Sequence, residues 1–164
     1  MQNEYKRVYL MDSSSLIELK NRYPRDIFPG VWEKMESLLA QRRLIIIEEV
    51  KKEIQQGDDE LNKWLKKFNL LIRKPTPETF ALVREILKRY PELAKEEKRG
   101  PNADPFLISE ALVIKKEESL FPSLPVVVTE ESPRRRGSIP NVCQEYQIAC
   151  TNLLGLFKME GWKF

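Results

Sequence analysis

Short apolar runs alternate along the chain with longer segments whose apolar residues recur at helical spacing. The runs are three or four residues long and rich in Val, Ile and Leu, which is typical of strands buried on both faces of a sheet. We predict strands at 8–11, 44–47, 70–72 and 125–128, and an edge strand at 148–151.

Helices are predicted in the intervals from apolar spacing and from residues that commonly begin or end a helix. The run 12–15 offers several N-caps, Thr76-Pro77 pairs a cap with proline at the first helical position, and Gly57 ends a helix. The predicted helices follow residue 12 and lie at about 31–39, 50–57, 59–68, 77–90, 104–116, from 139, and 153–159. A charged connection is expected at 92–101.

This alternation of strands and helices predicts a parallel sheet with right-handed crossovers. The expected fold class is therefore α/β, a three-layer α/β/α sandwich with four or five parallel strands. The length of 164 residues fits one domain, 1–164, because single cores commonly hold roughly 100–200 residues.

The composition indicates a globular protein with a heavily solvated surface, with 41% hydrophobic and 32% charged residues. No apolar run approaches the roughly 20 residues that span a bilayer, and the polar start lacks a signal-peptide core, so we expect a cytoplasmic protein without a membrane partner. Cys143 and Cys150 are expected to be free, packed thiols. A net charge of +3 does not by itself indicate nucleic-acid binding; the one dense basic cluster is 134–136, Arg-Arg-Arg.

Carboxylates follow several of the apolar runs, in a sequence that contains no histidine. Asp12 ends the first predicted strand, Glu53 follows the second, Glu130-Glu131 follow the run 126–129, and Asp104 opens the helix at 104–116. The C-terminal ends of parallel strands share one edge of a sheet, so acids distant in sequence can meet there. Oxygen ligands without histidine suit Mg²⁺ or Mn²⁺ better than zinc.

Each acid also has a structural interpretation. Asp12 can cap the following helix, although three serines nearby can do the same. On spacing alone a solvated Glu53 beside two lysines is favoured, and Asp104 before Pro105 is favoured as an N-cap. Glu130 and Glu131 can be solvated in a loop, and the arginine cluster can be a solvated loop or can hold phosphates.

Several stretches, in order and spacing, resemble the PIN domain, the nuclease fold of VapC-type toxins, and more closely an uncharacterised PIN-like prokaryotic family. They span nearly the whole chain. The matching stretches are Tyr9-Leu10-Met11-Asp12-Ser13-Ser14, Phe28-Pro29-Gly30-Val31-Trp32, Val50-Lys51-Lys52-Glu53-Ile54, Gly57-Asp58-Asp59-Glu60-Leu61 with Trp64, Ala103-Asp104-Pro105-Phe106-Leu107-Ile108, Val127-Val128-Thr129-Glu130-Glu131 and Ile139-Pro140-Asn141-Val142-Cys143.

The resemblance implies an acidic site made of Asp12, Glu53, Asp104 and Glu131. The last position departs from the usual T-x-D pattern, since it is Thr129-Glu130-Glu131 here, and this leaves Glu130 as a competing metal ligand. The resemblance also implies the strand order 3-2-1-4-5, frequent homodimers and, for toxin members, an antitoxin that inserts a segment at the site.

The function expected from these residues is metal-dependent endonuclease cleavage of RNA, as the toxin of a type II toxin–antitoxin pair. Asp12 and Asp104 are expected to be the principal ligands of Mg²⁺ or Mn²⁺, with Glu53, Glu131 or Glu130 ligating, positioning water or assisting proton transfer. Substrate contacts are expected from Ser13 and Thr129 and from the arginine cluster of Arg134, Arg135 and Arg136. The RNA is expected to be single-stranded or looped, because a carboxylate-lined cleft needs an accessible, deformable phosphate.

Two other classes of function compete with this expectation. The first is a catalytically inactive PIN-like module that binds RNA or protein, which the glutamate at the fourth acidic position favours and the other three acids oppose. The second is a phospho-accepting, receiver-like domain. It would require an acid pair after the first strand, where this chain has Met11-Asp12-Ser13.

Overall fold

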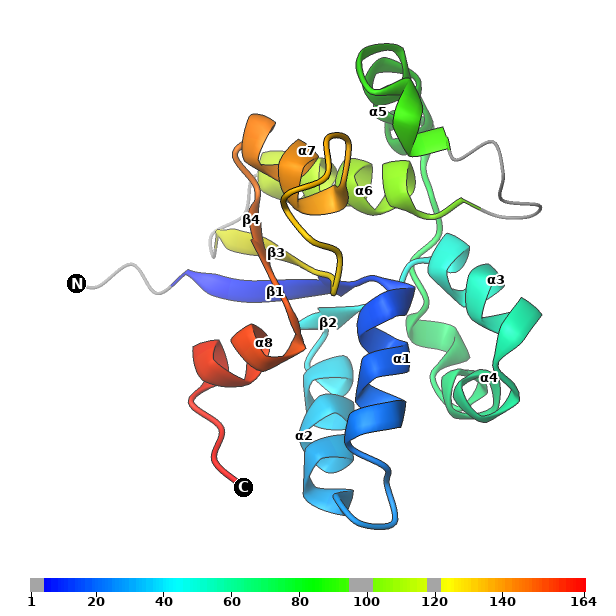
Figure 1. Cartoon of the computed structure of the whole chain (residues 1–164), viewed down its shortest axis with the longest axis vertical. Coiled ribbons are helices and arrows are strands. Elements are labelled where there is room, and N and C mark those ends of the chain that lie inside the picture. Colours follow the sequence, from blue (N-terminus) through cyan, green and yellow to red (C-terminus); the bar gives the residue numbers. More distant parts are fainter. Residues whose placement is uncertain (1–4, 95–101, 118–121) are drawn as a thin grey trace.

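Four parallel strands lie at the centre of the computed structural model, which describes residues 5–94, 102–117 and 122–164. They are β1 (Lys6–Met11), β2 (Leu44–Ile45), β3 (Ser123–Val128) and β4 (Ala149–Thr151), in the spatial order β2-β1-β3-β4 (Figure 1). The central pair is held in register, with Met11 opposite Val128, and all pairs are parallel.

Helices cover both faces of this sheet, as the α/β/α expectation required (Figure 1). Helices α1, α2 and α8 lie on one side, α6 and α7 on the other, and α3 and α4 stand beyond the C-terminal end of β1 (Figure 1). Their bounds are α1 Ser13–Arg22, α2 Pro29–Ala40, α3 Glu48–Gly57, α4 Asp59–Lys66, α5 Pro77–Arg89, α6 Asp104–Lys116, α7 Ile139–Glu145 and α8 Leu153–Glu160, with 3-10 turns η1 Asn69–Leu71 and η2 Pro91–Ala94.

The central strands are apolar without alternation because both of their faces are covered. Residues 8–11 of β1 and 125–128 of β3 are all buried. They belong to one continuous hydrophobic cluster that also takes in side chains of the helices on either side, among them Leu16, Met35 and Leu107. This core fixes the sheet, and the C-terminal ends of β1 and β3 therefore form a rigid edge.

The predicted strand at 70–72 is wrong. These residues lie in and beside the turn η1, where Leu70 is 98% exposed, and pairing is reduced to one parallel bridge between Ile47 and Arg73. Pro75 cannot donate a ladder hydrogen bond, so pairing cannot extend past this point. The bridge occupies the place of the third strand beside β2, so the predicted order 3-2-1-4-5 is otherwise kept and is consistent with a PIN-like fold.

Three predicted helix starts are confirmed by their N-caps. The Asp12 carboxylate accepts from the Ser13 amide, Asp58 caps α4, and Thr76 forms a capping box with Thr79 before Pro77. The charged connection at 92–101 differs in its first part, because residues up to Ala94 form η2; residues 95–101 lie outside the described part.

Two further expectations concern the cysteines and the membrane. Both cysteines are free thiols, with Cys143 buried and Cys150 half-buried. Within the residues described, no helix has the length and apolar character needed to cross a membrane.

The tight contact between β4 and α8 can be tested with two glycines. A Cβ at Gly155 would overlap the Thr151 hydroxyl and lie 3.0 Å from Thr151 Cβ, whereas a Cβ at Gly57, at the end of α3, has nothing within 4 Å. We therefore expect Gly155→Ala to lower the free energy of unfolding by about 1–3 kcal/mol because of overpacking.

Gly57→Ala is the matched control and should raise the same quantity by about 0.5–1 kcal/mol, because alanine favours a helix more than glycine does. Denaturant unfolding of the three proteins measures both changes. Equal effects of the two substitutions would contradict the close approach of Thr151 to α8.

Candidate active site

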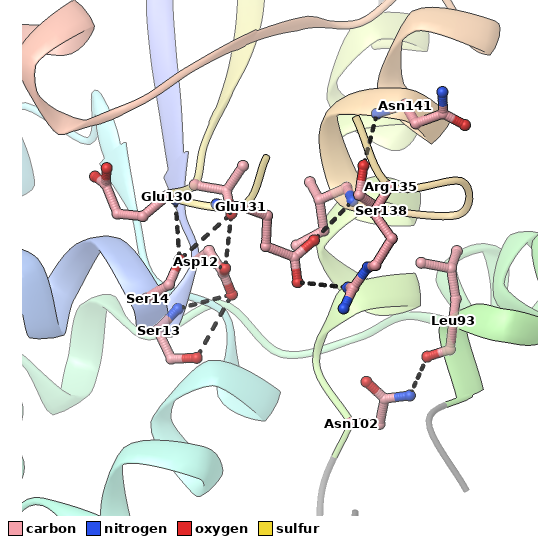
Figure 2. A network of polar contacts seen from close by, with 12 residues as sticks. Asp12, Ser13, Ser14, Leu93, Asn102, Glu130, Glu131, Arg135, Ser138 and Asn141 are labelled. Atoms are coloured by element: carbon pink, nitrogen blue, oxygen red, sulfur yellow. Dashed lines mark hydrogen bonds and ion pairs between the residues drawn. The ribbon is translucent and has the colours of Figure 1, made fainter. Parts of the chain in front are cut away.

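Asp12 is a buried carboxylate directly after β1, with 3% of its surface exposed. Its Oδ1 accepts from the Ser13 amide at 2.9 Å, and its Oδ2 accepts from Ser14 Oγ at 2.7 Å and Thr129 Oγ1 at 2.9 Å (Figure 2). Thr129 follows β3, whose carbonyl at Val128 accepts from the Asp12 amide at 2.8 Å. Parallel pairing of β1 and β3 thus brings Asp12 and Thr129 together from 117 positions apart.

Burial raises the pKa of Asp12 above its ordinary value. Hydrogen bonds from Ser14 and Thr129 oppose the rise, and the negative charges of Glu131 and Glu53 add to it. Asp12 is therefore a desolvated carboxylate with two acidic neighbours, and it forms no ion pair with Lys or Arg among the residues that the structure describes. A cation beside Asp12 would offset both the free-energy cost of burying its charge and its repulsion by Glu131 and Glu53.

Glu53 connects Asp12's helix to the start of α6. Its Oε2 accepts from Ser13 Oγ at 3.1 Å, and its Oε1 accepts from the Ala103 amide at 2.7 Å. The side chain is partly buried, not solvated beside the lysines as its spacing alone favoured. These two bonds join three segments that are 40 and 50 residues apart.

Asp104 does not cap α6, although the Asp-Pro pair favoured that role. Ala103 occupies the N-cap position without a side-chain bond, and Asp104 is the first residue of the helix, buried with 2% exposed. Its backbone neighbour Ala103 is the residue bound by Glu53, so Asp104 begins α6 next to the Glu53 carboxylate. The Asp104 carboxylate is therefore buried in the first turn of α6, one residue inside the cap position.

Glu130 and Glu131 leave the end of β3 in opposite directions (Figure 2). Glu131 Oε2 accepts from the Ile139 amide at 2.9 Å, its Oε1 lies 3.6 Å from Arg135, and its charge acts on Asp12. Glu130 Oε1 instead accepts from Ser15 Oγ at 3.1 Å and from the Leu153 amide at 2.9 Å, at the start of α8.

The residues predicted to contact substrate divide into two groups. Ser13 and Thr129 lie within the carboxylate network, where each donates to an acid. The arginines are exposed in the loop between β3 and α7, where Arg135 faces Glu131 and Arg136 lies 3.8 Å from Glu92. The backbone amide of Arg134 donates to the Ser132 hydroxyl.

Ser14 is a site residue that sequence reasoning treated only as a helix cap. Its Oγ donates to Asp12 and accepts from the Glu130 amide at 3.1 Å, so it joins the turn after β1 to the turn after β3 (Figure 2). Three consecutive serines after a strand-ending aspartate exceed what one cap needs, and that surplus was the available signal.

The donor set suits a hard divalent cation, since it offers carboxylate and hydroxyl oxygens and the chain has no histidine. Within residues 5–94, 102–117 and 122–164, however, no three Asp, Glu or Cys side chains gather closely enough to hold one ion. Glu53 and Glu131 are turned toward backbone amides. Metal binding would therefore require these side chains to move.

A family model described as "Domain of unknown function (DUF4411)" matches residues 9–164, nearly the whole sequence. The chain belongs to this family. Among solved structures, VapBC2 from Rickettsia felis bound to a DNA fragment from their promoter is similar, with a TM-score of 0.49 and 16% identity over 88% of this chain and 98% of that one. No curated protein matches. The DUF4411 assignment itself names no activity.

The raised pKa of Asp12 makes the stability of the fold depend on pH. A folded-state pKa above the unfolded value means that the folded protein binds more protons than the unfolded chain between the two values. The free energy of unfolding should therefore fall as pH rises from about 4 through the raised pKa of Asp12.

Asp12→Asn should remove that fall and raise the free energy of unfolding at neutral pH by about 0.5–2 kcal/mol, because asparagine caps a helix as well and carries no charge. Denaturant unfolding between acidic and neutral pH, with a chelator present, measures it. Asp59→Asn, a change of the same kind at an exposed position, is the control. An Asp12→Asn variant with the same pH dependence as the unsubstituted protein would contradict the desolvated carboxylate.

Proposed function

We propose that this DUF4411 protein is a metal-dependent endonuclease that hydrolyses RNA phosphodiester bonds. The observation that carries the proposal is Asp12, a carboxylate buried at the edge of the sheet, surrounded by hydroxyls and by the charges of Glu131 and Glu53. Structural carboxylates at such burial are ordinarily paired with a base. This one is arranged to meet a cation from outside the chain.

Asp12 and Asp104 would hold Mg²⁺ or Mn²⁺, assisted by Glu131 and Glu53. The bound cation would stabilise charge on the phosphate oxygens and lower the pKa of a water molecule. Glu53 and Glu131 would position that water or take up its proton as its oxygen attacks phosphorus and the leaving oxygen departs. Glu130 is left out of this assignment because its carboxylate is engaged by Ser15 and α8.

The arginines beside the site would bind the RNA backbone. Arg134 and Arg136 extend into solvent, and Arg135 stands next to Glu131, so phosphates on the strand that enters the site would meet this loop first. A single-stranded or looped RNA fits this arrangement better than a duplex, since the reacting phosphate must approach carboxylates at the sheet edge. An antitoxin partner, a toxin role and a homodimer remain predictions from the PIN-domain resemblance.

A second candidate is a catalytically inactive PIN-like module that binds RNA. It is favoured by the absence, among the described residues, of three acids placed to share one ion, and by the backbone amides that already engage Glu53 and Glu131. This candidate predicts RNA binding without cleavage and without stabilisation by metal.

Cleavage of single-stranded RNA in Mn²⁺ tests the two candidates directly. The protein should cleave, and Asp12→Asn should reduce the rate on the order of 100-fold or more, because it removes a ligand charge. RNA binding should persist, and stabilisation by Mn²⁺ in thermal unfolding should weaken. Asp59→Asn is the control for a carboxylate lost elsewhere on the surface.

The neighbouring glutamates add a second comparison. Glu131→Gln should lower the cleavage rate more than Glu130→Gln, because Glu131 acts on Asp12 and Glu130 is turned toward α8. RNA binding with no Mn²⁺-dependent cleavage sensitive to Asp12→Asn, and no shift of the unfolding midpoint at saturating Mn²⁺, would leave the binding module as the function.

Replacing the three arginines together by alanine should weaken RNA association and flatten its salt dependence. Fewer phosphates would be neutralised, and each lost contact lowers the slope of log affinity against log salt by about 0.7 for a single strand. Fluorescence anisotropy across a salt series measures this. Replacing Lys34, Lys63 and Lys116 removes equal charge from other elements and serves as the control; an equal loss of affinity would contradict a role specific to the loop.

A further inference from the structure

A cavity of about 530 Å³ opens beside the acidic site, between the loop after β3, helix α7 and strand β4. Thr129 and Glu131 belong both to the carboxylate network and to the wall of this cavity. The cavity and the acidic site therefore share a wall. The volume lies within the range of roughly 300–1,000 Å³ that is usual for sites of small organic ligands.

The far walls of the cavity are uncharged. Pro133, Pro140 and Ile148 supply apolar surface, and Gln144 and Asn152 supply amides. Among the described residues, Glu131, on the wall shared with the acidic site, is the one charged residue in the lining, and no lysine or arginine contributes to it. Such walls do not suit a phosphate; they suit a flat, neutral group with hydrogen-bonding edges.

The side-chain amides of Gln144 and Asn152 have hydrogen-bonding groups without a partner among the described residues. Asn152 Oδ1 is engaged by the Gly155 amide at 2.9 Å, which leaves its NH₂ group as a donor. Gln144, exposed on α7, makes no side-chain hydrogen bond within the described part of the chain, so its amide offers both a donor and an acceptor. Amides of this kind read the edges of nucleobases, while proline faces pack against their planes.

We propose that this cavity binds the nucleobase attached to the sugar next to the phosphate held at the acidic site, with Gln144 and Asn152 recognising its edge. The inference rests on the proposed function for its substrate class. It assigns base preference to the segment that joins β3, α7 and β4, while the carboxylates act on a phosphate that every nucleotide shares.

A cysteine in the wall allows the cavity to be tested without any cleavage. Cys150 lines the cavity and is half-buried, whereas Cys143 is buried, so a small alkylating reagent such as iodoacetamide should modify Cys150 first. Alkylation of the whole protein, in chelator and localised by mass spectrometry, reports on occupancy of the cavity. The probes are the four nucleoside 5′-monophosphates, with ribose 5-phosphate as the base-free control.

At least one nucleoside monophosphate should slow alkylation of Cys150 by about tenfold at a concentration ten times the one that half-protects, because only the empty cavity reacts. Ribose 5-phosphate should not protect. Gln144→Ala should raise the half-protecting concentration about five- to tenfold through the loss of a hydrogen bond. Gln55→Ala, another exposed helical glutamine, should leave it unchanged.

The outcomes separate this inference from the nuclease proposal. Protection by a base in a protein that does not cleave RNA supports the cavity as a base site and removes only the nuclease. Cleavage that depends on Asp12, without protection by any nucleotide or with equal protection by ribose 5-phosphate, overturns the base site and keeps the nuclease. Protection that is identical in Gln144→Ala also overturns the assigned recognition.

Discussion

A buried carboxylate must be compensated by its surroundings, and in this fold that requirement falls on Asp12. Hydroxyls of Ser14 and Thr129 and the amide of Ser13 supply the compensation, and the bonds tie the turn after β1 to the turn after β3. Hydroxyls and amides satisfy the oxygen atoms without neutralising the charge. The oxygens of Asp12 therefore have hydrogen-bond partners, while the negative charge of the carboxylate is not neutralised by a basic side chain of the described residues. The pKa of Asp12 is raised accordingly.

The positions of Glu130 and Glu131 follow from their place at the same edge of the sheet, directly after β3. After β3 ends at Val128, the side chains of Glu130 and Glu131 point in opposite directions (Figure 2). Thr129 bonds Asp12, and Glu131 returns to that side, where its amide donates to Thr129 Oγ1 at 3.2 Å. Glu130 falls on the other side, against α8. Glu131, rather than Glu130, therefore lies on the side of Asp12.

The features that were predicted correctly from the sequence are those that neighbouring residues determine, namely buried strands and helix starts. Apolar runs located the strands because burial on both faces demands continuous hydrophobicity, and the cap Thr76 marked a helix start within one residue. The failures involve contacts distant in sequence. The run at 70–72 has strand composition, but Pro75 and the outward Leu70 leave it without a partner beyond Arg73.

The structural roles predicted for Glu53 and Asp104 from nearby residues were wrong for the same reason. Spacing on α3 favoured a solvated Glu53, because the groups that bind it, Ser13 and Ala103, come from elsewhere in the chain. The Asp104-Pro105 pair predicted Asp104 as the N-cap of α6, whereas the N-cap is Ala103, one position earlier. The PIN-domain resemblance assigns both residues to the acidic site, and that assignment stays a prediction.

Three glutamates of this region each accept from the backbone at a helix start: Glu53 at α6, Glu131 at α7 and Glu130 at α8. Amides at helix starts favour negative charge, and these contacts fix the three helices to the sheet edge. A cation at Asp12 would compete with the amides for Glu53 and Glu131. Because each amide would then lose its acceptor, cation binding would be coupled to the first turns of α6 and α7. Glu130, on the opposite side of the strand end, would keep α8 in place while they adjusted.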